Sequence, residues 1–280
     1  MRRFQRLLGR LLPLAALGVL LFTSTGCVFF YSANAAPPGR YVPPMEKGQG
    51  DFGVDIPLGR NPSYGVEVGA DGEPEPDNDQ PPMWLGLDLA FRYGLTDQIG
   101  LDARITTSFL VPFPFPMPNG FTLAPIFELL EKPEQGIALH LSPRGIWTNG
   151  VYISSGINDY RTETKVHAAG GELPVMFTYS PVEWFDLSGT AFFRAFYVFA
   201  ERDDNTSSGA IQAKAHWPAL GGGLTVAAIL TAGRFRISLG AGLEAGPNLA
   251  ANYTDADGEV SGDGAMVLYP QGGLTIGAGW

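Results

Sequence analysis

The sequence predicts an all-β fold, a closed antiparallel barrel of about ten strands that crosses a membrane. Stretches after residue 50 alternate apolar and polar residues with a period of two, which is the period of side chains along a strand. Short connections between these stretches alternate with long polar or proline-rich ones. Membrane barrels likewise have short turns at one end and longer loops at the other. The polar faces consist mainly of Gly, Ser, Thr, Asp and Arg, and the whole chain has only four lysines.

The first 26 residues are predicted to be a signal peptide that does not belong to the fold. Four arginines precede the apolar run 11–22, and the first 26 residues contain no acidic residue. This run of 12 residues is too short for a bilayer core, which needs about 20 residues, and matches a secretory signal. Cys27 follows three small residues and is the only cysteine, so an intramolecular disulfide and a multi-cysteine metal site are excluded.

Ser24-Thr25-Gly26-Cys27 resembles the lipobox of bacterial lipoproteins. The resemblance implies handling by the lipoprotein-processing machinery, cleavage before Cys27 and acylation of its thiol, and several acyl chains would form a stable anchor. Val28, in place of Asp, implies the outer membrane. The alternative is an ordinary secretory signal cleaved near residues 35–36. Residues 27–50 are proline-rich and are predicted to be a tether.

Residues 51–280 are predicted to form the barrel, and the clearest hairpin covers 83–110. Its two strands are separated by a turn at 94–98, and each places most of its apolar side chains on one face; no helix would separate these sets. Similar alternation occurs at 172–179, 185–199 and 235–246. Both chain ends are expected on the periplasmic side. Because bacterial barrels have an even number of strands, eight and twelve strands are the alternatives to ten.

The connections define the strand limits. Short turns are expected near 94–98, 131–135, 180–183 and 232–234. Long loops are expected at 70–82, 111–119, 147–164, 200–208 and 247–263.

The C-terminal segment carries a separate signal. One face of the last strand is formed by Leu274, Ile276, Ala278 and Trp280. This pattern resembles the terminal strand of outer-membrane β-barrel proteins, which implies recognition by the barrel assembly machinery and insertion among outer-membrane lipids. A soluble barrel with its apolar face inward would alternate equally well. Aromatic residues near the strand ends favour the membrane barrel.

The inward faces of the predicted strands carry ionisable side chains. The lumen candidates are Asp88, Arg92, Asp102, Arg104, Glu128, His140, Arg144, Glu172, Asp186, Arg194, Arg236 and Glu244. Opposite charges in a narrow lumen can pair across strands, and side chains already fill an eight-stranded barrel. A structural plug is therefore favoured over a charge-selective pore.

Candidate chemistry is sparse. His140-Leu141-Ser142 resembles locally the His-x-Ser pair of outer-membrane lipid A deacylases, but Pro143 replaces the Asn of that pattern and His140 is expected to point inward. A hydrogen-bonded lumen histidine is therefore predicted. The segment 255–258 begins like a calcium loop but lacks the later ligands, and is predicted to be an acidic surface loop. No metal, cofactor or catalytic residue is expected.

The formal net charge is -10, and the sequence shows no basic face of the kind that a nucleic-acid-binding protein needs. The sequence predicts an outer-membrane barrel lipoprotein with a structural, surface or narrow-pore role, and it leaves the oligomeric state open. The alternatives are a small-solute porin or transporter, a lipid A-modifying hydrolase, and a tethered soluble barrel that binds lipid.

Overall fold

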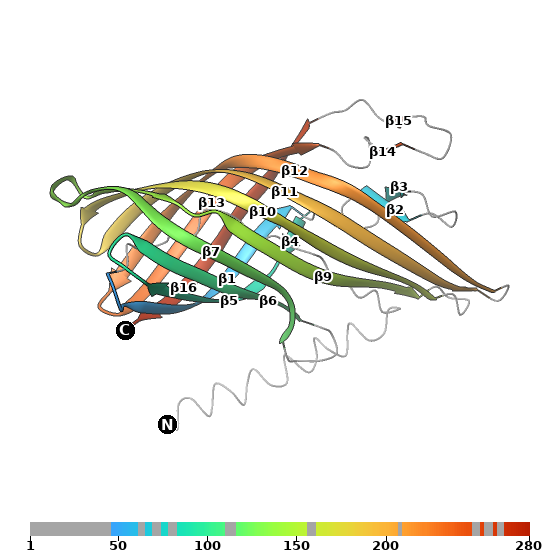
Figure 1. Ribbon diagram of the computed structural model, residues 1–280, viewed down its shortest axis with the longest axis horizontal. Helices are drawn as coiled ribbons and strands as arrows, with labels where there is room; N and C mark the ends of the chain where they lie inside the picture. The colour runs from blue at the N-terminus through green and yellow to red at the C-terminus, as the bar shows by residue number, and fades with distance from the viewer. Residues whose placement is uncertain are drawn as a thin grey trace, which may run out of the picture.

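The computed structural model describes residues 46–60, 65–68, 74–77, 83–109, 116–155, 161–206, 209–247, 253–254, 260–261 and 266–280. Its main sheet is a closed antiparallel barrel (Figure 1). The barrel strands are β1 (Gly50–Arg60), β4 (Met83–Leu85), β5 (Leu87–Gly94), β6 (Ile99–Phe109), β7 (Pro116–Lys132), β8 (Ile137–Leu141), β9 (Arg144–Ser155), β10 (Arg161–Val182), β11 (Phe185–Thr206), β12 (Gly209–Ala232), β13 (Phe235–Pro247) and β16 (Met266–Gly279).

The twelve strand segments of this sheet amount to ten barrel strands. Segments β4 and β5 both pair with β1, and β8 and β9 both pair with β7 and β10, so each couple is one interrupted strand. The second interruption falls at Ser142-Pro143, because proline has no N–H for the ladder. Pairing of β16 with both β13 and β1 closes the ring. The predicted fold class and the count of ten are confirmed.

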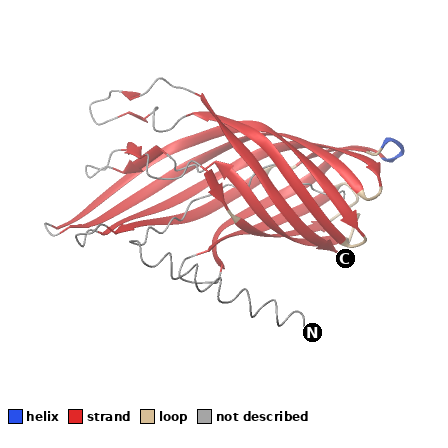
Figure 2. Ribbon diagram, turned by 180° about the vertical axis from the view of Figure 1, so that it is seen from behind, coloured by secondary structure: helices blue, strands red, loops and turns tan. Residues whose placement is uncertain are grey.

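Both described chain ends lie at one rim of the barrel, together with the short turns. Trp280 and Gly50 exchange backbone hydrogen bonds there, and Figure 2 shows the 3-10 turn η1 (Pro133–Gln135) at the same end as the C-terminus. Gly136 and Gly233 take left-handed conformations in two of these turns, which glycine adopts without steric cost. Short turns mark the periplasmic side of a membrane barrel, so this rim is the periplasmic one.

Two of the long loops predicted from the sequence are strands in the structure. Strands β9 and β10 continue through most of 147–164, and β11 and β12 continue through most of 200–208, so that β12 reaches 24 residues. These strands extend far beyond the rest of the barrel, away from the C-terminus (Figure 1). Where a strand extends beyond the membrane, neither of its faces needs to be apolar. The alternation of apolar and polar residues therefore fades there, although the backbone pairing continues. The polar composition of these segments then resembles that of a loop.

Smaller strands occupy other expected connections. The hairpin of β2 (Gly65–Val68) and β3 (Pro74–Asp77) precedes β4, and β14 (Tyr253–Thr254) pairs with β15 (Val260–Ser261). Residues 46–49, expected in the tether, are already bonded to the barrel, where the Gly48 N–H donates to the Gly94 carbonyl at 2.9 Å.

The two faces of the wall differ as the alternation predicts. Large apolar side chains cover the outside, including Leu224 at 67% exposure and Leu239 at 66%, while charged side chains are buried inside. A soluble barrel has the opposite arrangement, whereas an apolar outer band flanked by aromatic residues is typical of transmembrane barrels. The protein is therefore a membrane-spanning barrel of the outer-membrane type. Among the residues described, no helix is long and apolar enough to cross a membrane.

The last strand carries its predicted apolar residues on the outer wall. Ile276 and Trp280 are exposed, and Leu274 and Ala278 are half-buried. The Trp280 ring lies 5.8 Å from the ring of Phe91 on β5. Recognition of this strand by the assembly machinery stays a prediction.

Candidate functional site

Charged side chains from six strands meet inside the barrel. They are Asp51 and Asp55 on β1, Asp88 and Arg92 on β5, Asp102 and Arg104 on β6, Arg144 on β9, Glu172 on β10 and Arg236 on β13. We call these nine residues the lumen network. Each sits at a position where the strand period directs the side chain inward.

Asp102 is the most connected carboxylate of the lumen network. The Arg104 Nη2 lies 2.6 Å from its Oδ2, and the Arg104 Nε donates to both of its oxygens at 2.9 and 3.0 Å. These two residues are two apart on β6 and therefore share a face. The guanidinium groups of Arg92 and Arg144 approach the same carboxylate at 4.0 and 3.9 Å. Asp102 thus joins three arginines from three strands.

The remaining contacts extend the network to both sides. Arg92 Nη1 donates to Asp51 Oδ1 at 3.0 Å, and Arg236 Nη1 reaches the other oxygen of Asp51 at 3.2 Å. On the far side, Arg144 Nη1 donates to Glu172 at 3.4 Å. The chain of contacts therefore runs from β13 through β1, β5 and β6 to β9 and β10.

The lumen network is almost inaccessible to solvent. The side chains in its ion pairs are at most 4% exposed, apart from Arg236 at 19%. Removing charges from water costs several kcal/mol per ion, which good geometry and several partners offset. Solvent therefore reaches very little of these side chains at this level of the lumen.

A second cluster lies on β11, β13 and β16. Arg194 and Gln271 both donate to the Glu244 carboxylate, and the Arg194 guanidinium lies 5.2 Å from the centre of the Phe192 ring. A Cβ at Gly221 would force the Glu244 carboxylate to move. This cluster adds a second place where paired side chains occupy the interior.

The structure buries most of the predicted lumen candidates inside the wall, but it does not bring them all together. Asp88, Arg92, Asp102, Arg104, Arg144, Glu172 and Arg236 lie in the lumen network, and Arg194 and Glu244 lie in the second cluster. His140 and Asp186 are buried without joining either. Glu128 is only half-buried, near the periplasmic end of β7.

The sequence interpretation did not include Asp51, Asp55 or Gln271. The first two alternate with Phe52, Val54 and Ile56, which is the signal that identifies an inward face, but they lie next to the expected tether. Gln271 follows a proline in a glycine-rich stretch with weak alternation. All three side chains are buried.

His140 and Ser142 share the inward face of the interrupted strand. Both are buried, and neither ring nitrogen of His140 nor the Ser142 Oγ has a hydrogen-bond partner within the described structure. The expected hydrogen bond from His140 to a neighbour is therefore wrong. The inward direction separates both side chains from the lipid on the outer face.

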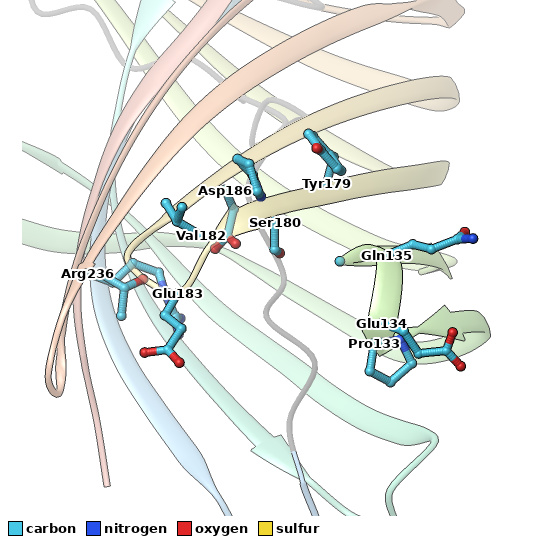
Figure 3. A pocket seen from close by; sticks show the side chains of 12 residues that line it. Pro133, Glu134, Gln135, Tyr179, Ser180, Val182, Glu183, Asp186 and Arg236 are labelled. Carbon is cyan, nitrogen blue, oxygen red and sulfur yellow. The ribbon is translucent and has the colours of Figure 1, made fainter.

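A cavity of about 880 Å³ opens at the periplasmic end of the barrel. Figure 3 shows Pro133 and Glu134 on one side of it and Val182, Glu183 and Arg236 on the other. Arg236 also belongs to the lumen network. One residue therefore lines the cavity and also takes part in the lumen network.

Some predicted sites lie outside the described residues, namely Cys27 and the acidic segment 255–258. Within the described part of the chain, no three His, Cys, Asp or Glu side chains are grouped to hold a metal ion.

Comparisons with solved structures return outer-membrane barrels at low identity. The outer membrane protease OmpT of Escherichia coli is 10% identical, with 86% of this chain and 97% of that chain covered and a TM-score of 0.45. The toluene transporter TbuX of Ralstonia pickettii is 9% identical, with coverage of 84% and 89% and a TM-score of 0.34. Ail, the attachment invasion locus protein of Yersinia pestis, is 12% identical, with coverage of 83% and 97% and a TM-score of 0.29.

No protein-family model matches the sequence. No curated protein matches it either.

Proposed function

We propose that this protein is a closed, non-conducting outer-membrane barrel with a structural or surface role. The observation that carries the proposal is the burial of the lumen network, whose ion-paired side chains are at most 4% exposed apart from Arg236. A pore needs hydrated side chains along its wall, and this wall is filled. The long strands β9–β12 would then present the surface-exposed part of the molecule.

Planar bilayers test this proposal. The wild-type protein is expected to show no discrete conductance steps. The double variant Arg92→Ala/Arg104→Ala removes two large side chains that are at most 1% exposed, so water should enter and unitary steps should appear. Glu134→Ala, in the exposed periplasmic turn, is the matched control and should stay silent. Regular steps from the wild-type protein would instead support the porin alternative.

We further propose that Cys27 carries the acyl anchor and that the barrel also holds itself in the membrane. Cys27→Ser is expected to abolish incorporation of labelled palmitate, because the thiol is lost. The apolar outer wall should keep this variant resistant to carbonate extraction. Label retained by Cys27→Ser would contradict the anchor, and release by carbonate would mean that lipid alone holds the protein.

The absence of catalysis is part of the proposal. The inward direction of His140 and Ser142 supports it, because a hydrolase acting on lipid needs its nucleophile on the outer face. An unchanged lipid A acylation pattern after expression of the wild-type protein is the expected result.

A further inference from the structure

The outer face of the long strands carries an unusual group of side chains near the extracellular end of the apolar band. Two of the chain's four lysines and two of its three histidines lie here. The group consists of Lys165 and His167 on β10, Glu201 and Asp203 on β11, and Lys214 and His216 on β12. We call these six residues the rim patch. They share the face of the lipid-exposed residues Val175, Phe193 and Leu224.

The strand register aligns the rim patch in rows across three strands. His167, Phe199 and His216 stand side by side in one row, and Lys165, Glu201 and Lys214 form the next row outward. The row on the other side of the histidine row, toward the periplasmic end, contains Tyr197. Tyr197 and Phe199 are 41% and 47% exposed and are placed as an interfacial aromatic belt would be. The charged row therefore lies just beyond the belt, where the headgroups of the outer leaflet begin.

Contacts hold these side chains in place on the surface. The Lys214 Nζ donates to Glu201 at 2.7 Å, and the Lys165 Nζ donates to Asp203 at 3.3 Å. These two contacts tie each lysine to a carboxylate on the neighbouring strand β11. The Tyr197 hydroxyl and His216 Nδ1 are 2.5 Å apart, and the two rings stack.

Both lysine side chains are accessible to a ligand. An ammonium group has three donors, and one of those of Lys214 is used for Glu201. The Lys214 side chain is 72% exposed and that of Lys165 is 41% exposed. On a chain with so few lysines, their placement on one membrane-facing surface favours a specific anionic ligand over general solubility, and lipid phosphate is the anion that a membrane offers at this level.

We propose that the rim patch binds the phosphate groups of outer-leaflet lipid headgroups. The two ammonium groups contact phosphate, the imidazoles of His167 and His216 add donors on the membrane side, and the two carboxylates hold the lysines in position. This site depends on the orientation of the barrel in the membrane and is independent of whether the lumen conducts.

Native mass spectrometry of the purified protein tests the proposal. The probes are lipid A with its two phosphates and the same lipid after enzymatic dephosphorylation. The wild-type protein is expected to retain the phosphorylated form at least ten-fold better. Lys165→Gln/Lys214→Gln should remove this preference, and Lys165→Arg/Lys214→Arg should restore it because arginine also binds phosphate.

Lys132→Gln provides the matched control, because Lys132 is an exposed lysine at the periplasmic end. It should leave retention unchanged. Heat-dependent gel mobility verifies that each variant is folded. Equal retention of the two lipids by the wild-type protein, or an unchanged preference in the double glutamine variant, would overturn the proposal.

Discussion

Replacing Asp102 with alanine is expected to lower the free energy of unfolding by about 3–5 kcal/mol. Asp102 is fully buried and contacts the guanidinium groups of Arg92, Arg104 and Arg144. Its removal leaves these cations in the interior without their shared partner, and an uncompensated buried charge is costly. Equilibrium urea unfolding of the protein refolded in lipid vesicles, followed by tryptophan fluorescence, measures the loss.

Glu134→Ala is the control for this measurement. Glu134 is exposed in the 3-10 turn, so its removal should change the unfolding free energy by less than about 0.5 kcal/mol. A loss below about 1 kcal/mol for Asp102→Ala would mean that water solvates the lumen, and the closed-barrel proposal would fail with it.

Replacing Leu224 with arginine should destabilise the inserted barrel by about 2–4 kcal/mol, the cost of a cation near the bilayer midplane. Leu224 lies on the outer face of β12 and is 67% exposed, with apolar residues on both sides along the strand. The same vesicle unfolding measurement reports the change. A soluble barrel would tolerate this exposed substitution.

The same strand supplies the matched control. Gln212 shares the outer face of β12 with Leu224 but lies beyond the rim patch. Gln212→Arg should therefore cost no more than about 1 kcal/mol, as substitutions near the interface do. Equal effects of the two substitutions would contradict the position of the membrane.

The lumen network also links strands that lie on either side of the ring closure. Asp51 near the start of β1 pairs with Arg236 on β13, 185 residues away in the sequence. These strands flank β16, the strand that closes the ring. A contact that forms only when β16 is inserted between its two neighbours favours the closed barrel over an open sheet.

The sequence by itself determined which way most side chains face. Alternation is local, so Leu89 and Asp88 could be assigned to opposite faces without knowledge of any partner strand. The same reasoning predicted the hairpin at 83–110, the ten strands and the common rim of both chain ends. These properties depend only on neighbours along the chain.

The tertiary structure decided which inward charges meet and where the long strands end. Asp102 pairs with Arg104 two residues away but also with Arg144, whose approach depends on barrel closure and on the stagger between strands. His140 faces inward as predicted, yet among the described residues its ring nitrogens have no hydrogen-bond partner. The extensions of β9–β12 escaped prediction because pairing between polar strands relies on backbone hydrogen bonds, which leave no apolar period in the sequence.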